Sequence, residues 1–309
     1  MTAPAEPTLV AAPKGMPLVT AIVALLVLGA AWGVSVPLTK VATSSGHGIF
    51  GLIFWQLVVV AVALVCVQVI QRKPIRVRSH HLVLLLAIAL LGTLIPNSFT
   101  YLAISRIPAG VHAIMMSLVP MFAFVIAMAM RNEAFVPLRL CGVLLGLLGV
   151  LLIIGPEASL PEKGMWLFVL IGALGTVCYG IEGNYVARFG LGGLNPVEVL
   201  LYSSILGAVL VLPLTLGTGQ FIDLSQAWAA PEYALVGLSL LHAVAYVGYI
   251  WLVGQAGPIF AAQVSYPVTL FGVLASIVIL GESYSGWVWW ALVIMLVGLF
   301  LVQPRKATT

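Results

Sequence analysis

The stretch AGVHAIMMSLVPMFAFVIAMAMRNE, Ala109–Glu133, is an apolar run long enough to cross a bilayer, with Pro120 at its centre. A second stretch, AGPIFAAQVSYPVTLFGVLASIVILGE (Ala256–Glu282), also has a central proline, Pro267, and also ends in glutamate. A proline inside a helix leaves a backbone carbonyl unpaired, and within lipid that group must be satisfied inside protein or a wet cavity. Two such copies in one chain predict a doubled membrane fold.

The composition places the whole chain in lipid. Hydrophobic residues make up 62% of the 309 residues and charged residues only 7%, which excludes a soluble globular protein. At roughly 20–25 residues per span plus short loops, this length holds about ten spans and no sizeable soluble domain. The net charge of +4 fits the excess of Lys and Arg in cytoplasmic loops, and no patch for nucleic acid is present. Three cysteines, Cys66, Cys141 and Cys178, lie within apolar runs and are expected to be packing residues.

Apolar windows bounded by charged residues, Gly, Pro and Asn predict ten helices. They are expected at roughly 17–41, 48–70, 82–105, 109–130, 137–155, 164–187, 195–215, 232–254, 258–280 and 285–302. Residues 17–155 are expected to form a first repeat of five helices and residues 164–302 a second. Residues 1–16 and 303–309 are expected to be cytoplasmic tails.

The distribution of Lys and Arg predicts the orientation of the chain in the membrane. With the N-terminus inside, ten of these residues fall on inside segments and three, Lys40, Arg106 and Lys163, on outside segments. Both termini are therefore expected in the cytoplasm. A tryptophan cluster, Trp287, Trp289 and Trp290, is expected to anchor the last helix at the outer interface.

The duplication extends beyond the proline-containing helices. An offset of 147 residues aligns Trp32-Gly33 with Tyr179-Gly180 and Pro120 with Pro267. After the prolines the offset becomes 149, which aligns Glu133 with Glu282. Because five helices per repeat is an odd number, the two halves must insert with opposite topology. That is the inverted-repeat plan of many secondary transporters, whose substrate site lies near the midplane where the repeats meet.

Several segments resemble a known family. The WGVSVPLTK segment beginning at Trp32, the Gly-x9-Pro helices and the helices CGVLLGLLGVLLI and ALVIMLVGLFLV resemble the EamA-type, ten-helix members of the drug/metabolite transporter superfamily. The resemblance covers residues 17–302. It implies an all-α integral membrane protein of ten helices in two inverted repeats, with a central cavity formed chiefly by helices 1, 3, 4, 6, 8 and 9. It also implies efflux of metabolites or amino acids across the bacterial inner membrane.

One position departs from that family. Its members often carry an Arg after an aromatic residue in the second helix, whereas the sequence FWQL places Gln56 there. A role for this position in binding a substrate anion is therefore not expected.

Amide and aromatic side chains collect in the predicted central layer. A mostly apolar pocket with a few such groups suits a small amphipathic or aromatic metabolite better than a sugar phosphate or nucleotide sugar, which would need buried cations. Each side chain taken singly could also face lipid or pack in the core. The candidate substrate-binding residues are Trp32, Gln56, Asn97, Tyr179, His242, Tyr246, Gln263 and Tyr266.

Two ionisable residues inside predicted helices are candidates for proton coupling. His242 lies nearest the predicted bilayer centre, and a histidine can change its charge near physiological pH. Glu182 could exchange a proton or bind a cationic group. The structural alternatives are a neutral His242 hydrogen-bonded to another helix and a Glu182 paired with Arg188 or a neighbouring helix. His112, one turn inside the outer end of its helix, is expected to lie half-exposed at the interface.

The two central prolines are candidate hinges. Pro120 and Pro267 would free carbonyls near Met116 and Gln263 to line a cavity, although a kink that serves only packing is the alternative. The glycines Gly142-x3-Gly146 permit close approach of another helix. This approach could be intramolecular or form a dimer face, so both a monomer and a homodimer remain open.

A secondary transporter is the function that these features favour. A membrane receptor or scaffolding protein is the first alternative and a membrane-embedded enzyme the second. No HExxH, no pair of acids at helical spacing and no nucleophile beside a base is present, so no catalytic residue, metal or cofactor is expected. An ATP-driven pump is unexpected because the chain has no GxxxxGK[ST] segment. The expected partners are a small-molecule substrate and the lipid bilayer, with proton counter-transport as an open option.

Overall fold

The structure, a computed structural model, describes residues 17–72, 77–131, 133–156, 160–162, 164–256 and 258–303. Within this part of the chain all regular structure is helical, and no strand is present. Among the described residues, nine helices are long and apolar enough to cross a membrane, and a tenth, Gly286–Val302, is shorter and also apolar. The ten predicted helices are confirmed, with ends that differ by at most three residues from those expected. The predicted tails, apart from Gln303, lie outside the described residues.

Three of the ten spans are assembled from several helical segments. The third span (Ser79–Arg106) contains a π-helical turn, the fourth (Ala109–Ala129) is two helices, and the ninth contains a 3₁₀ turn. In chain order the segments are α1 (Leu18–Thr43), α2 (Ile49–Ile70), η1 (Ser79–His81), α3 (Leu82–Ile88), η2 (Ala89–Leu94), α4 (Ile95–Arg106), α5 (Ala109–Met115), α6 (Leu118–Ala129), α7 (Pro137–Ile154), α8 (Met165–Phe189), α9 (Pro196–Gly217), α10 (Ala230–Ala256), α11 (Pro258–Ala261), η3 (Ala262–Val264), α12 (Ser265–Leu280) and α13 (Gly286–Val302).

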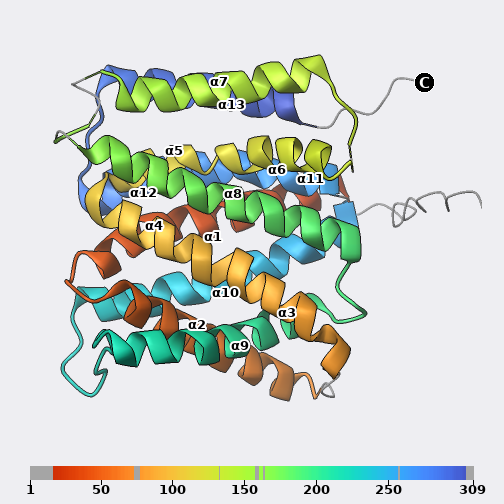
Figure 1. Cartoon of the computed structure of the whole chain (residues 1–309), viewed down its shortest axis with the longest axis vertical. Coiled ribbons are helices and arrows are strands. Elements are labelled where there is room, and N and C mark those ends of the chain that lie inside the picture. Colours follow the sequence, from red (N-terminus) through yellow and green to blue (C-terminus); the bar gives the residue numbers. More distant parts are fainter. Residues whose placement is uncertain are drawn as a thin grey trace, which may run out of the picture.

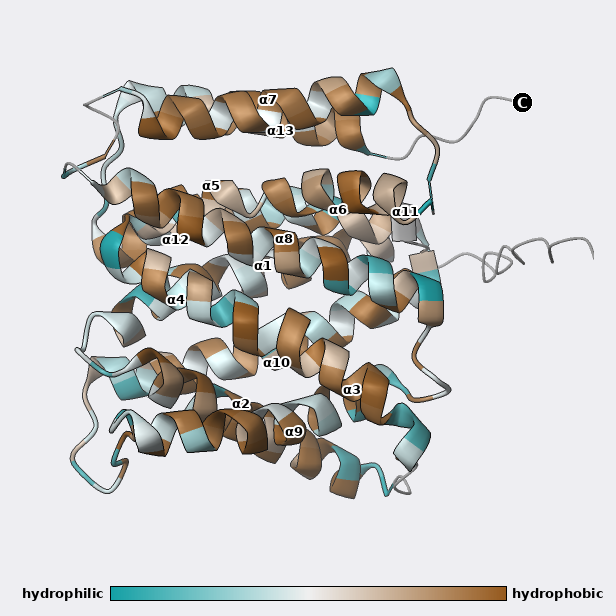
Figure 2. Ribbon diagram, in the orientation of Figure 1, coloured by the Kyte–Doolittle hydropathy of each residue, from teal (hydrophilic) through white to brown (hydrophobic). Residues whose placement is uncertain are grey.

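The residues at the helix ends explain where the spans begin. At the start of α9, the Asn195 side chain accepts a 3.0 Å hydrogen bond from the backbone of Glu198, whose carboxylate accepts one of 2.9 Å from the backbone of Asn195. This reciprocal cap satisfies two amides that no helical carbonyl can reach. Figure 2 shows apolar residues along the length of the helices and hydrophilic residues mostly near their ends.

Matching contacts in the two halves show the inverted repeat. Helix α1 crosses α12 where Gly33 meets Gly272, and a Cβ added at Gly33 would lie 2.8 Å from the backbone nitrogen of Gly272. Helix α8 crosses α6 in the same way, since a Cβ added at Gly180 would lie 3.0 Å from the backbone nitrogen of Ala123. These are equivalent positions in the two repeats. The fold is therefore two five-helix repeats related by a pseudo-two-fold axis.

The helices form a bundle with one pair at each edge (Figure 1). Helices α7 and α13 form one edge, and α2 and α9 form the other. A Cβ added at Gly142 of α7 would lie only 2.5 Å from the carbonyl oxygen of Gly298 of α13. The predicted packing role of the α7 glycines is thus an intramolecular contact, which joins the fifth helices of the two repeats.

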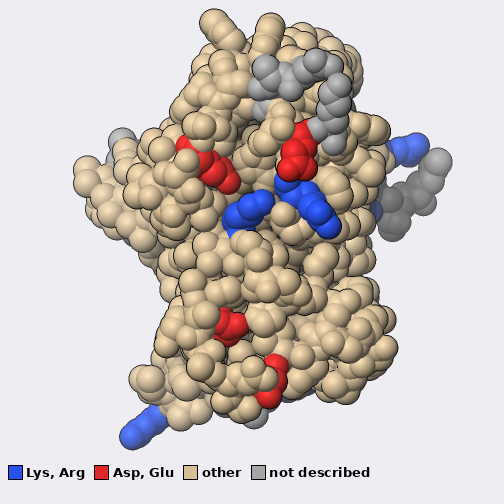
Figure 3. Space-filling view, turned by 90° about the vertical axis from the view of Figure 1, so that its left-hand side faces the viewer, with Lys and Arg blue, Asp and Glu red and all other residues tan. Residues whose placement is uncertain are grey.

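The end of the bundle at which α1 finishes is here called the Lys40 end; the charge pattern predicts that it faces outward. Figure 3 views this end, where a few acidic and basic side chains lie on an otherwise uncharged surface. The Nζ atom of Lys40 donates hydrogen bonds to the carbonyl oxygens of Ile104 (2.7 Å), Ser105 (3.3 Å) and Ile107 (3.0 Å). These carbonyls belong to the end of the third span, so Lys40 ties α1 to α4.

A carboxylate holds the next helix at the same end. Glu282, just after α12, accepts hydrogen bonds from the backbone amides of Ala109 (2.7 Å) and Gly110 (3.0 Å) at the start of α5. The Tyr284 hydroxyl donates a further hydrogen bond of 2.6 Å to the same carboxylate. At the opposite end, Glu133 pairs instead with Arg139, whose Nε donates 2.7 Å to the carbonyl oxygen of Val302.

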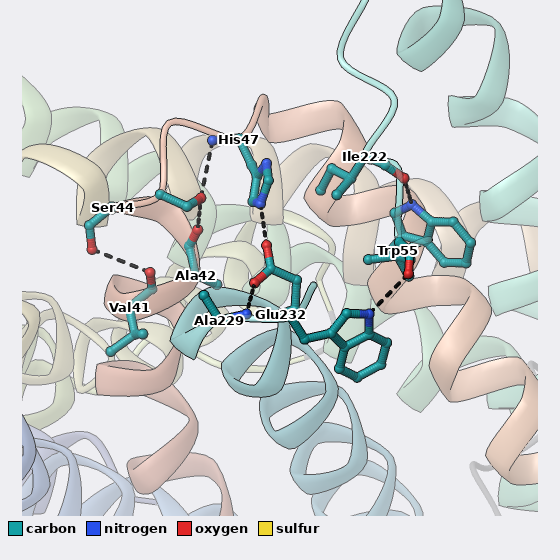
Figure 4. A network of polar contacts seen from close by, with 11 residues as sticks. Val41, Ala42, Ser44, His47, Trp55, Ile222, Ala229 and Glu232 are labelled. Carbon is teal, nitrogen blue, oxygen red and sulfur yellow. Dashed lines mark hydrogen bonds and ion pairs between the residues drawn. The ribbon is translucent and has the colours of Figure 1, made fainter. Parts of the chain in front are cut away.

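The turn after α1 is fastened to the first turn of α10 (Figure 4). The Nε2 atom of His47 lies 2.6 Å from a carboxylate oxygen of Glu232, whose other oxygen accepts 2.8 Å from the backbone of Ala229. Nearby, the indole N–H of Trp55 donates a 3.0 Å hydrogen bond to the carbonyl oxygen of Ile222. The Lys40 end is thus closed by contacts between segments of both repeats.

Candidate functional site

A cavity of about 330 Å³ lies at the centre of the bundle. Spans 1, 2, 3, 4, 6, 8 and 9 contribute its walls, and no described residue of α7, α9 or α13 lines it. The residues that line it are Trp32, Ser35, Val36, Thr39, Gln56, Gly92, Asn97, Thr100, Tyr101, Ile104, His112, Met116, Val119, Pro120, Ala123, Tyr179, Glu182, Gly183, Leu238, His242, Tyr246, Tyr249, Ala262, Val264, Ser265 and Val268. The resemblance implied six of these seven spans; the second span adds Gln56.

Most of the residues singled out in the sequence come together here. Both candidate proton-coupling residues, Glu182 and His242, line the cavity, as does Pro120. Of the eight candidate substrate-binding residues, six line it: Trp32, Gln56, Asn97, Tyr179, His242 and Tyr246.

Three of the singled-out residues lie elsewhere on span 9. Gln263 is exposed and does not line the cavity, and the Tyr266 hydroxyl is buried without a hydrogen-bond partner among the described residues. Pro267 packs on α1, where a Cβ added at Gly29 would lie 2.5 Å from the proline ring. The Gln263 side chain therefore does not line the cavity; on this span the cavity wall is made by Ala262, Val264, Ser265 and Val268.

The wall formed by α2 and α4 carries a buried amide network. The Oε1 atom of Gln56 accepts hydrogen bonds from Asn97 Nδ2 (2.8 Å) and from the Tyr101 hydroxyl (2.5 Å). The Tyr179 hydroxyl of α8 donates 3.1 Å to Asn97 Oδ1, so the network connects the two repeats. Gln56 and Asn97 are 4% and 6% exposed, which makes these hydrogen bonds necessary to compensate the burial of their polar groups.

The adjacent wall, formed by α8, carries a carboxylate. Glu182 lies one turn beyond Tyr179 on the same face of α8, and its Oε1 atom accepts a 3.0 Å hydrogen bond from the Tyr246 hydroxyl of α10. The predicted alternative of a partner on a neighbouring helix is thus correct, although a tyrosine fills that role. Glu182 is the only acidic residue among the described residues that line the cavity, and no Lys or Arg lines it there.

The π-helical turn η2 makes room for this carboxylate. A Cβ added at Gly92 would lie 2.9 Å from Glu182 Oε1, so a larger residue here would displace the side chain. Such turns are rare and often occur at functional sites. The sequence signal for this turn is Pro96, four residues after Gly92. Proline has no N–H, so the Gly92 carbonyl lacks its usual helical partner.

Aromatic rings cover much of the remaining surface. The rings of Trp32 and Tyr249 lie 5.6 Å apart, and those of His242 and Tyr246 lie 5.9 Å apart. Ring contacts of this kind form a stiff, mostly apolar wall with polar groups at its edge. His242 therefore stands beside the Glu182–Tyr246 hydrogen bond.

His112 was missed as a cavity residue. It was expected half-exposed at the interface, yet it is 2% exposed and lines the cavity, and its Nδ1 atom has no hydrogen-bond partner among the described residues. Only its position near a predicted helix end was visible in the sequence. The packing of the fourth span against α8, at Gly172, is what buries it.

The breaks in spans 4 and 9 occur at matching places. Helix α6 begins at Leu118 and α12 at Ser265, which makes Pro120 and Pro267 the third residue of each. The residue four positions before Pro120, Met116, lies in the break and lines the cavity. The two prolines thus mark equivalent breaks, but only Pro120 reaches the cavity in this structure.

Comparison with known proteins accords with this architecture. The model of the EamA-like transporter family matches residues 19–155 and 164–303. Seventeen chains of solved structures match; one, described only as the crystal structure of a protein, is 17% identical, with a TM-score of 0.63 over 92% of this chain and 96% of that one. At that identity the likeness shows the fold alone. No match is found among curated proteins.

Proposed function

Because the chain belongs to the EamA-like transporter family, we propose that it is a secondary transporter that moves a small amphipathic or aromatic metabolite by alternating access. The observation that carries this proposal is the central cavity, which is shared by both repeats and lies where broken helices meet. Its volume of about 330 Å³ is near the lower end of the range for small-molecule sites. Amino acids and compounds of similar size are the substrate class.

Export across the bacterial inner membrane, with both termini in the cytoplasm, is the proposed direction and location. The sequence pattern supports this orientation, because ten of the thirteen Lys and Arg residues are expected on the same side as the termini. The proposed substrate-binding residues are the six candidates that line the cavity, and Pro120 and Pro267 are the proposed hinges.

Proton coupling through Glu182, His242 or both is the proposed driving mechanism. A carboxylate in a membrane span whose only described hydrogen-bond donor is Tyr246 can take up a proton when that side of the cavity becomes wet. Release of the proton on the other side would return the residue to its charged form. The same carboxylate could bind the ammonium group of a substrate, so that proton and substrate compete for one site.

Flux across the membrane of reconstituted vesicles tests the proposal. A thermal-shift screen of the purified protein against amino acids, amines, purines and vitamins first identifies ligands, because a ligand of the folded state raises the apparent Tm. Each ligand is then loaded in vesicles with and without the protein, and its movement is followed. If no ligand crosses faster than through empty vesicles, the receptor or scaffolding alternative replaces the transporter proposal.

A further inference from the structure

The hydrogen bonds inside the cavity determine which polar groups remain for a substrate. On the α2 side, both hydrogen bonds to Gln56 end on its carbonyl oxygen. No described residue accepts a hydrogen bond from its Nε2 amide group, and Gln56 lines the cavity. The amide nitrogen has two N–H groups. The polar group that this wall offers to a ligand is therefore a neutral donor.

On the α8 side the polarity is reversed. Glu182 uses one carboxylate oxygen to accept the Tyr246 hydrogen bond, and no described residue donates to the other oxygen. A carboxylate only accepts hydrogen bonds, and it attracts a cationic donor most strongly. Aromatic faces nearby, Trp32 and Tyr249, favour the same kind of group. This side of the cavity suits an ammonium group.

The balance of charge then distinguishes between two kinds of substrate. An amino acid would bring a second charge, its carboxylate, into a cavity where no described lining residue is Lys or Arg. Lys40 lies beyond the cavity and gives its hydrogen bonds to three backbone carbonyls. Burial of a charge without a partner is strongly unfavourable, whereas burial of a neutral carbonyl that faces an amide donor costs little.

We propose that the preferred substrate of this site is a monovalent organic cation: a small apolar or aromatic amine that also carries a neutral carbonyl oxygen, as an amino-acid amide or ester does. Its ammonium group binds Glu182, and its carbonyl oxygen accepts a hydrogen bond from Gln56. The proposal rests on the transport function proposed above and narrows its substrate class. Tyr179 takes part in the Gln56 network and lies one turn from Glu182 on α8. The Gln56 amide and the Glu182 carboxylate therefore lie on adjacent walls of the cavity.

Three related compounds test this polarity: phenylalaninamide, phenylalanine and phenethylamine. Their binding to the purified protein is measured by calorimetry at about pH 7, where most of each amine is still protonated and competition by protons is weaker than in acid. We expect phenylalaninamide to bind at least about tenfold more tightly than either of the others, because one lacks the carbonyl and the other adds an unpaired negative charge.

Two variants assign the contacts. Gln56→Glu keeps the oxygen that accepts from Asn97 and Tyr101 but replaces the donor by an acceptor, so phenylalaninamide should lose its advantage over phenethylamine. Glu182→Gln should weaken both cations about tenfold or more. Tyr233→Phe, at an exposed position on α10 that does not line the cavity, is the control and should bind as the parent protein does.

The outcomes separate this inference from the transport function. If phenylalanine binds as tightly as its amide, if Gln56→Glu keeps the amide's advantage, or if none of the three compounds binds, the inferred substrate class is wrong. Flux in vesicles is scored separately. If a zwitterionic amino acid is transported, the transporter proposal stands and the inferred substrate class is overturned. If the three compounds bind in the expected order but none is transported, the inferred ligand class stands and the transporter proposal is overturned.

Discussion

The ammonium group of Lys40 donates a 2.7 Å hydrogen bond to the carbonyl oxygen of Ile104, and Ile104 is one of the residues that line the central cavity. The contact therefore lies directly beyond the cavity, at the end of the bundle where α4 ends and α5 begins. Each charge lies at the helix end that it stabilises: the Lys40 cation contacts the carbonyls at the C-terminus of α4, and the Glu282 carboxylate contacts the amides at the N-terminus of α5. Opening the cavity toward this end requires these contacts to break.

Lys40→Met should open the Lys40 end more often. Loss of three hydrogen bonds to a charged donor is expected to shift the open–closed equilibrium by about 2 kcal/mol, or about thirtyfold. A cysteine at Ser35, which lines the cavity, reports on this opening in a protein whose native cysteines are replaced. A membrane-impermeant maleimide added outside spheroplasts should label it faster in the Lys40→Met background.

Arg106→Met is the control for that experiment. Arg106 is a cation at the same end, exposed, with its guanidinium over the Phe168 ring at 5.9 Å rather than on backbone carbonyls. It should leave the labelling rate nearly unchanged. Equal acceleration in both variants would mean that charge alone, and not the tether between α1 and α4, keeps this end closed.

Gly92→Ala should weaken substrate binding without unfolding the protein. The added methyl group would lie 2.9 Å from Glu182 Oε1 and must push the carboxylate from its place beside Tyr246. We expect an increase of about tenfold in the Kd of a cationic ligand, measured by calorimetry. Gly217→Ala, at the end of α9 where an added Cβ meets nothing within 4 Å, should bind normally. An unaltered Kd for Gly92→Ala would show that Glu182 does not contact the ligand.

Glu182→Gln should abolish the dependence of transport on a pH gradient. The amide keeps an oxygen to accept the Tyr246 hydrogen bond but cannot exchange a proton. Flux is measured in vesicles with and without a pH difference, for this variant and for His242→Ala. If His242→Ala alone loses the response, the histidine is the coupling residue. A response retained in both variants would exclude the two side chains as coupling sites.

Gly142→Ala should destabilise the pair of helices at the edge of the bundle. Its methyl group would lie 2.5 Å from the carbonyl oxygen of Gly298, which as backbone has little freedom to move. Overpacking of this kind costs about 1–3 kcal/mol, so the apparent Tm of the purified protein should fall by several degrees. At Gly286 an added Cβ meets nothing within 4 Å, and Gly286→Ala should leave the Tm unchanged.

The fold could be predicted closely because its signals are local. Ten apolar windows, an odd number of helices per repeat and matched prolines determine the architecture, and the helix ends follow from charged, Gly and Pro residues. Much of the site followed as well, because polar residues in the middle of a span have few places to go other than a cavity.

The rest of the site depends on how each helix is rotated about its own axis. The sequence of this protein gives no signal for that rotation. Spans that are apolar all round give no periodicity to show which face is inward, so Gln263 could be assigned to the cavity when it is exposed. The same limit hid the burial of His112. The π-helical turn at Gly92 depends on tertiary packing, because it forms where the third span meets Glu182 of the second repeat.

The two repeats agree in shape but differ in charge at their ends. In the alignment of the two repeats, Ala187 corresponds to Lys40. Glu133, which corresponds to Glu282, forms an ion pair with Arg139 of its own repeat. The tether at the Lys40 end therefore has a different counterpart at the opposite end, where Arg188, next to Ala187, donates a 3.3 Å hydrogen bond to the carbonyl oxygen of Met130. The two access states then differ in free energy, and the empty protein is expected to rest with the Lys40 end shut. Its slowest step would be the one that exposes the cavity there, so turnover would respond to conditions that weaken hydrogen bonds at that face.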